Sequence, residues 1–275
     1  MSIKKSIGFL ALFCTGLLPC ALNAQNMPKI MTVTRVHFDP NSGHTFDEWK
    51  AVEKEYFDKV TLKNNLILGA NVLVHFYTND NSEILLVTTY GSWEDIEKAN
   101  AKSDELVKAA WPDSVKREAF FKKQASFYTS MHSDEIRSIL PDAKLAAADT
   151  SPLVYNIRTR HLAFPQDGKQ SEFGELMKEY SENVIQKNPL LKGYYPSRHA
   201  WGADSREFVD AFVYASLADM DKANDNTESL VKAHWPDEKK RKEFFDKLGK
   251  YFEKWHGDAI YTNVPVLRKI PKPAK

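Results

Sequence analysis

The chain contains an internal duplication, and this feature constrains its fold more than any other. The stretch from Lys108 to Asp113 reads KAAWPD, and the stretch from Lys232 to Asp237 reads KAHWPD. The two tryptophans stand at positions 111 and 235, and the difference, 235 − 111 = 124, aligns the two halves without a gap from about position 33 to position 136. Roughly a third of the aligned residues are identical, which predicts two copies of one structural unit.

The N-terminus has the pattern of a secretory signal peptide. Lys4 and Lys5 precede an uncharged apolar run over 7–18, and a small residue, Ala24, stands before the expected cleavage site. We expect residues 1–24 to be removed and the protein to be exported, either to a periplasm or to the exterior. The apolar run is too short to span a bilayer comfortably. A lipid anchor at Cys20 is the less favoured alternative, because Pro19 stands where such a signal takes a small residue.

Charge and cysteine content limit the partners and the chemistry. Both cysteines, Cys14 and Cys20, lie in the expected signal peptide, so we expect neither a disulfide nor a thiolate nucleophile in the mature chain. Removing residues 1–24 takes away two lysines, which leaves 38 − 2 = 36 basic residues against 37 acidic ones, a net charge of −1. Such a chain, with both signs interspersed, lacks the basic footprint of nucleic-acid or anionic-membrane binding. We therefore expect no nucleic-acid and no membrane partner.

The first copy is predicted to contain strands and helices in the order strand, helix, strand, strand, helix, strand. Apolar and β-branched residues predict strands at 31–38, 67–78, 84–90 and 135–139. Capping residues predict helices that begin at Thr45 and Ser92, and Pro112 is expected to begin a further helix that ends near Met131. The second copy repeats this order. The expected boundaries are repeat 1 at 25–140, a linker at 141–152, repeat 2 at 153–266 and a basic, fraying tail at 267–275.

This element order is the ferredoxin-like β-α-β-β-α-β unit. A four-stranded sheet with helices on one face leaves its other face bare, and two units in one chain can bury these faces against each other. The duplicated order resembles the dimeric α/β-barrel superfamily over nearly all of the mature chain. The expected fold class is therefore α+β, with two tandem ferredoxin-like repeats packed as a pseudo-dimeric α/β-barrel. The resemblance implies a pocket between the sheets and functions such as cofactor-free monooxygenase, cyclase, isomerase or haem-degrading enzyme.

Histidine is the residue type that points most directly to a site. Six of the eight histidines form three pairs related by the 124-residue offset, and strand alternation places the second pair on a mixed aromatic and polar face, typical of a pocket wall. The three pairs are His37 with His161, His75 with His199, and His132 with His256. The face beside the second pair carries Asn71, Leu73 and Tyr77 in the first copy and Tyr195, Ser197 and Trp201 in the second.

These residues predict acid–base chemistry on a bound small molecule. A neutral imidazole exchanges a proton near pH 7, and a tyrosine can hold an oxyanion. The second copy is the better candidate because it is more polar and more aromatic. The alternative is that each histidine only satisfies a hydrogen bond inside a packed barrel. The candidate catalytic residues are His199, His161, Tyr214, Asp210, His75, His37 and Tyr90, and the candidate substrate-binding residues are Tyr195, Trp201, Phe212 and Tyr77.

A His-x-Asp sequence also recurs, as His132 with Asp134 and as His256 with Asp258. We expect each pair at the end of a long helix, where a histidine is stabilised by the helix dipole and the aspartate caps a turn. The functional alternative is that the aspartate orients the histidine as a base, or that both bind a metal.

The sequence predicts no cofactor. The histidines lack the short spacing of a zinc site, and a haem-attachment sequence is missing. The leading hypothesis is an exported protein that binds a small organic molecule, with cofactor-independent acid–base catalysis by pocket histidines as its enzymatic form. The alternatives are a non-catalytic carrier or interaction module and a haem- or metal-handling protein. Assembly into a homo-oligomer stays open.

Overall fold

The computed structural model describes residues 27–147, 150–202 and 204–271. The expected signal peptide at 1–24 therefore lies outside the described residues. The elements of repeat 1 are β1 (Ile30–Phe38), α1 (Phe46–Tyr56), a π-helical turn (Phe57–Thr61), β2 (Gly69–Tyr77), β3 (Glu83–Tyr90), α2 (Trp93–Ala110), α3 (Ser114–Ala125) and β4 (Tyr128–Ile139). Those of repeat 2 are β5 (Val154–Leu162), α4 (Gln170–Tyr180), a π-helical turn (Ser181–Ile185), β6 (Gly193–Trp201), β7 (Glu207–Tyr214), α5 (Leu217–His234), α6 (Glu238–Gly249), β8 (Phe252–Asn263) and a short 3-10 turn (Pro265–Leu267).

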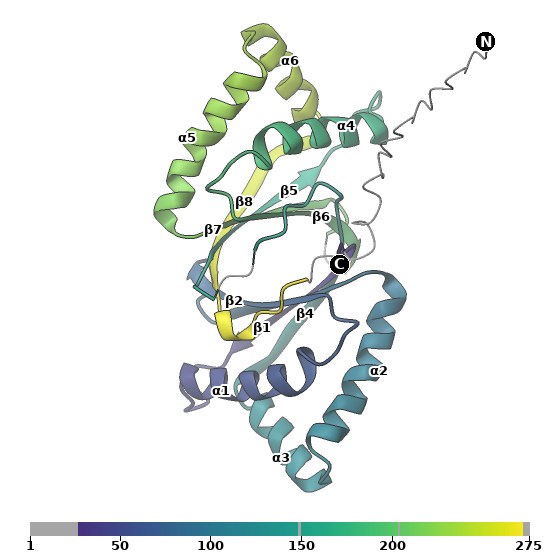
Figure 1. Ribbon diagram of the computed structural model, residues 1–275, viewed down its shortest axis with the longest axis vertical. Coiled ribbons are helices and arrows are strands. Elements are labelled where there is room, and N and C mark those ends of the chain that lie inside the picture. Colours follow the sequence, from purple (N-terminus) through teal and green to yellow (C-terminus); the bar gives the residue numbers. More distant parts are fainter. Residues whose placement is uncertain (1–26, 148–149, 203, 272–275) are drawn as a thin grey trace, which may run out of the picture.

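Within the described residues, eight strands close into a single barrel. Their order is β1-β3-β2-β8-β5-β7-β6-β4, and each neighbouring pair is antiparallel where the pairing is given. The strand order of repeat 1 recurs half-way round the barrel in repeat 2, so a pseudo-two-fold axis runs along the barrel. Helices α1, α2 and α3 cover one side and α4, α5 and α6 the opposite side (Figure 1). The sheet face without helices is thus buried inside the barrel, as the duplication predicts.

The barrel has two distinct ends. The turns between β2 and β3 and between β6 and β7 lie at one end, which we call the hairpin end. The chain leaves β4 and β8 at the other end, which we call the strap end. Strap 1 is residues 140–146 after β4, and strap 2 is residues 264–271 after β8.

Each strap crosses to the other repeat. Lys144 of strap 1 forms a backbone bridge with Tyr194 in β6, and Lys269 of strap 2 forms one with Ala70 in β2. The Lys144 ammonium donates a hydrogen bond to the carbonyl oxygen of Asn188 at 2.9 Å, and Lys269 does so to that of Asn64 at 2.7 Å. A lysine stabilises the unpaired carbonyls that follow a helix. The repeats are therefore joined by two reciprocal crossings in addition to their strand pairs.

The prediction of a fraying tail is wrong as far as residue 271. Leu267 is buried in the same apolar cluster as Trp49 of α1 and Phe127. The backbone amide of Val264 also donates to the carbonyl of Val72 in β2. Apolar burial and backbone pairing in repeat 1 hold the tail in place, and neither contact can be recognised from the composition of the tail.

The KAxWPD sequence forms a helix corner in both repeats. Asp113 caps α3 by accepting a hydrogen bond from the backbone amide of Lys116 at 3.0 Å. Trp111 stacks on Phe120 with ring centroids 4.2 Å apart. The helix begins at Ser114, two residues later than predicted, because Asp113 rather than Pro112 begins it.

The end of α3 is also predicted wrongly. The helix ends at Ala125 rather than near Met131, and β4 begins at Tyr128. The hydroxyl of Ser126 donates to the carbonyl of Lys123 and closes the last turn. Residues from Tyr128 onward then pair with β1, although their polar composition gives little strand signal.

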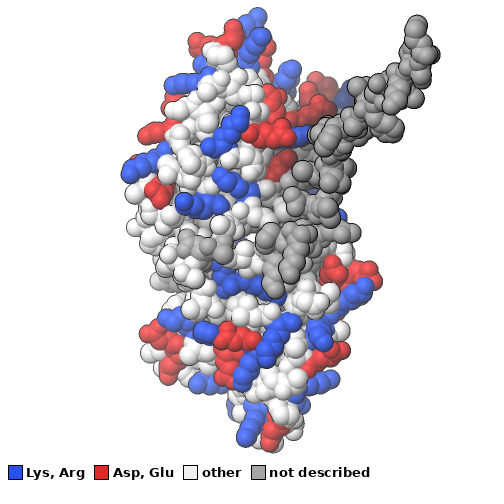
Figure 2. Space-filling view, viewed as in Figure 1, with Lys and Arg blue, Asp and Glu red and all other residues white. Residues whose placement is uncertain are grey.

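The surface shows charges of both signs. Basic and acidic side chains are interspersed over the face in Figure 2, with neither sign forming a continuous field there. In the described part of the chain, no helix is both long and apolar enough to cross a membrane.

Candidate site inside the barrel

The barrel encloses a cavity of about 420 Å³. Alternate residues of the strands point into it, since successive side chains of a strand face opposite ways. Its wall is mostly aliphatic and includes Val33, Leu73, Val87, Ile157 and Val209. A concave, mainly apolar space with a few polar groups is the usual form of a small-molecule site.

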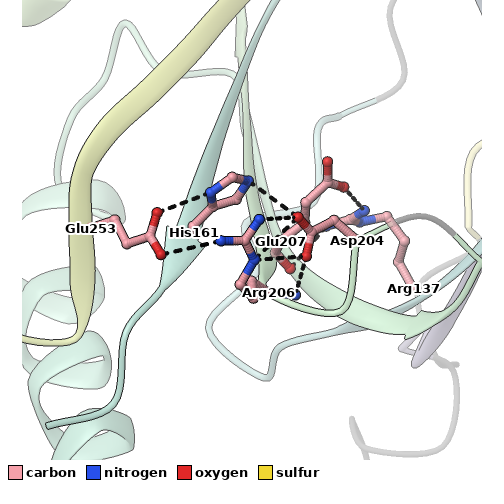
Figure 3. Close-up of polar contacts among 6 residues, drawn as sticks. All are labelled: Arg137, His161, Asp204, Arg206, Glu207 and Glu253. Atoms are coloured by element: carbon pink, nitrogen blue, oxygen red, sulfur yellow. Dashed lines mark hydrogen bonds and ion pairs between the residues drawn. The ribbon is translucent and has the colours of Figure 1, made fainter.

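Arg137 provides a buried positive charge in this wall. Its side chain is only 3% exposed, and it lies on β4 where that strand pairs with β6 of the other repeat. Its guanidinium donates to the carboxylates of Glu135 at 2.8 Å and Glu207 at 3.1 Å, and to the hydroxyl of Ser197 at 3.2 Å (Figure 3). One cation thus faces two carboxylates, and the pairing spans both repeats.

The equivalent position in repeat 2 carries a tyrosine. Tyr261 follows Arg137 by the 124-residue offset, and its hydroxyl donates to Glu83, the equivalent of Glu207. Glu83 also pairs with Arg35 at 3.0 Å. Each repeat therefore reaches across to a glutamate at the start of a strand in the other repeat, but with a different donor.

A second polar group lies between the charged cluster and strap 2. Tyr155 and Tyr195 line the cavity together with Asn71 and Arg268. Burial raises the pKa of Tyr155 to about 12 and also raises that of Tyr195, so both phenols keep their protons at neutral pH. The side-chain oxygen of Asn71 is buried without a hydrogen-bond partner among the described residues. A buried acceptor left unpaired is costly, which makes it a natural contact for a ligand donor.

Four of the predicted histidines lie at the hairpin end, outside the residues that line the cavity. His37 is buried and its Nδ1 lies 2.9 Å from Asp80. His161 lies between two carboxylates, with Nδ1 3.1 Å from Glu253 and Nε2 3.7 Å from Asp204 (Figure 3). Hydrogen bonds from Arg206 hold the pKa of Asp204 well below its usual range.

The second histidine pair lies at the ends of β2 and β6. His75 is 2.7 Å from the hydroxyl of Thr78 through Nδ1, and His199 is half-buried. Their predicted neighbours divide between two places. Asn71, Leu73, Tyr195 and Ser197 line the cavity, whereas Tyr77 and Trp201 are exposed at the hairpin end.

The remaining candidates lie on the outer face of the barrel, under the helices. Tyr90 packs with Ile67 and Ala99, and Tyr214 packs in a cluster that Phe212 joins at its edge. Asp210 is buried and accepts hydrogen bonds from Tyr194 and from Arg160, each at 2.6 Å. These side chains alternate with the cavity-lining Val209 and Ala211, so they point away from the cavity.

The two His-x-Asp pairs stand within strands, and the expectation of a helix end is wrong. His132 and Asp134 belong to β4, with Nε2 and Oδ2 3.5 Å apart, and His256 and Asp258 belong to β8, 3.1 Å apart. Early termination of the preceding helices moves both pairs into the strands. Their side chains are exposed and bond to neighbouring strands: Asp134 accepts from Thr34, and Asp258 from Arg158.

The donors in the cavity do not fit haem or a metal ion. Axial haem ligands are usually histidine, cysteine, methionine or tyrosine. No histidine of the described residues lines the cavity, and both lining tyrosines are held protonated, which leaves Met31 alone. Nowhere in the described ranges do three histidine, cysteine, aspartate or glutamate side chains group in a way that could hold a metal. No step is derived through either group.

Sequence reasoning missed Arg137, Glu135, Glu207 and Tyr155. One signal was present: Glu83 and Glu207 are identical across the duplication and begin equivalent strands. Arg137 could not be paired with Glu207 because their contact depends on how β4 aligns with β6 of the other repeat.

Similarity to known proteins is confined to the fold. No protein-family model matches the chain, and no curated protein matches its sequence. A candidate monooxygenase from Fusobacterium nucleatum superposes with a TM-score of 0.57 at 12% identity, covering 90% of this chain and 96% of that one. A candidate monooxygenase from Lactobacillus acidophilus gives 0.55 at 10% identity, covering 90% and 98%. A mutant chlorite dismutase from Candidatus Nitrospira defluvii gives 0.51 at 11% identity, covering 88% and 94%.

These structures confirm the fold predicted from the duplication. The chain is an α+β protein with the pseudo-dimeric, ferredoxin-like barrel of the dimeric α/β-barrel superfamily.

Proposed function

We propose that the chain binds a small, mainly apolar organic molecule inside the barrel. The observation that carries this proposal is the cavity of about 420 Å³, whose aliphatic wall holds a buried, unpartnered acceptor on Asn71. The ligand would carry a hydroxyl or N–H group to satisfy that oxygen, beside the protonated phenols of Tyr155 and Tyr195. The expected signal peptide adds the proposal that the protein works after export.

The first experiment tests whether ligands occupy the cavity. Ala211 lines it, so Ala211→Phe should fill part of the space, whereas Ala109→Phe places the same ring on the exposed surface of α2. Affinity for 2-naphthol, measured by calorimetry on the purified chain, should fall at least tenfold in Ala211→Phe and stay unchanged in Ala109→Phe. Equal affinity in both variants would refute binding inside the barrel.

A second variant tests the polar contact. Asn71→Leu removes the acceptor and keeps a similar shape. The affinity for 2-naphthol should fall about tenfold, because a hydrogen bond to a buried acceptor is lost, while that for 2-methylnaphthalene should not fall. An equal loss for both probes would show that Asn71 acts through packing alone.

Catalysis is the second candidate, and the fold similarity to candidate monooxygenases favours it. Because the histidines stand outside the cavity lining, a proton donor in the cavity would be Tyr155 or Tyr195. Oxygen uptake with a panel of phenols tests this candidate. Turnover that Tyr155→Phe and Tyr195→Phe leave intact would exclude the tyrosines from the chemistry.

A further inference from the structure

Large apolar side chains surround the hairpin end of the barrel in an exposed, pseudo-symmetric arrangement. Tyr77 is 61% exposed and Trp201 72%, at the ends of β2 and β6. Met131 is 61% exposed and Trp255 51%, near the starts of β4 and β8. Both pairs differ by 124 residues, so they are equivalent positions of the two repeats. We call these four residues the lip.

The lip is more than a chance scatter of apolar residues. Single exposed apolar side chains are common, but a group of them around one opening marks an interaction site. One member is also held in place: the ring of Trp255 lies 4.7 Å from that of His161, which is itself held between Glu253 and Asp204. His161 is therefore a positioning residue for the lip.

The cavity reaches the surface at this same end. Of the described residues that line it, only Arg35 and Ser133 are exposed, and these two are paired neighbours on β1 and β4 towards the hairpin end. At the strap end the lining residues, among them Pro28, Ala143 and Ile270, are buried or half-buried. There the two straps are held by their backbone bridges and by Lys144 and Lys269.

We infer that the hairpin end is the entrance to the cavity and that the lip is a capture site for a planar apolar ligand. The inference rests on the proposed function, because it concerns the route to the same cavity. The ligand stacks first on Trp201 or Trp255, as flat apolar molecules do on indole rings. It then passes Arg35 and Ser133 beside the Arg137 cluster, whose charges are already paired to one another.

Ser133→Trp narrows the proposed entrance and gives a kinetic test. Binding and release of 2-naphthol, followed by stopped flow, should each slow at least tenfold while the dissociation constant changes less than twofold. A barrier on the only route affects both directions equally, whereas a lost contact would change the dissociation constant. The double variant Lys144→Met/Lys269→Met loosens the straps and should leave both rates unchanged. If it accelerates exchange and Ser133→Trp does not slow it, the ligand enters at the strap end and the inference is wrong.

The capture site is tested where the cavity is blocked. In Ala211→Phe, 2-naphthol should still shift the indole N–H resonances of Trp201 and Trp255 in a weak, saturable manner, and Trp201→Ser/Trp255→Ser should abolish this binding. Trp93→Ser is the matched control, because Trp93 is 49% exposed on α2 outside the lip. Absence of these shifts would refute the capture site.

Two further outcomes are distinguishable. If Ala211→Phe does not weaken binding in the otherwise unaltered chain, the proposed function fails before the entrance is tested. If size measurements show a dimer that Trp201→Ser dissociates, the lip is an interface between copies and the inference is overturned.

Discussion

Replacing Arg137 by methionine should strongly destabilise the protein. Methionine fills much of the same space but leaves Glu135 and Glu207 without their shared cation, at side-chain exposures of 17% and 23%. Removing one partner of a fully buried ion pair costs roughly 3–5 kcal/mol, and the partial exposure of the two glutamates places the loss near the lower limit, at about 3 kcal/mol. A substitution of that size is exceptional for an ordinary surface position but expected here.

The pseudo-equivalent tyrosine supplies a matched control. Tyr261→Phe removes one hydrogen bond to Glu83, but Glu83 keeps its ion pair with Arg35, so the loss should be only about 1 kcal/mol. The double variant Arg137→Met/Glu207→Gln should recover part of the loss seen in Arg137→Met, because one of the unpaired charges is gone.

Urea unfolding at neutral pH, followed by circular dichroism, measures all three variants. The slope of the free energy of unfolding against urea must stay constant for the comparison to hold. A loss below about 1 kcal/mol in Arg137→Met, or no recovery in the double variant, would refute the claim that this cation balances the carboxylates.

Three other changes test separate parts of the fold. Burial raises the pKa of Glu53 above its usual 4.5, so the folded state binds more protons and stability falls as the pH rises from about 4.5 through that pKa; Glu53→Gln should flatten this decline in urea midpoints. Lys144→Met and Lys269→Met should each cost about 1–2 kcal/mol, and a loss in neither would show that the caps are unimportant. Gly202→Ala should cost about 2 kcal/mol in thermal unfolding, because φ is 94° and a Cβ would stand 2.6 Å from the Asp134 carbonyl oxygen.

Much of the fold could be predicted because the duplication and the alternation of strand residues are local signals. Alternation correctly selected Asn71, Leu73, Tyr195 and Ser197 as one face, and these residues line the cavity. It could not show how far along a strand the enclosed part extends. The pairing of β2 with β8 becomes irregular at His75, so this histidine stands where the wall ends.

Contacts between the repeats could not be predicted. The alignment of β4 with β6 sets which residue faces Glu207, and nothing local in either strand determines it. The same limit applies to strap 2, whose Leu267 packs on helices more than 200 residues earlier in the chain. Tyr90 and Tyr214 were misleading for another reason: ending a strand does not reveal which face a residue occupies.

The fusion of two repeats also gives the barrel a direction. Two identical subunits around a two-fold axis would offer a ligand two indistinguishable poses, related by half a rotation. In this chain Arg137 stands where its counterpart is Tyr261, and Ser197 where its counterpart is Leu73, so the two poses differ in energy. A molecule in the cavity therefore has one preferred handed orientation, and a mirror-image pair of ligands should be distinguished by a protein whose ancestor, if symmetric, offered both poses equally.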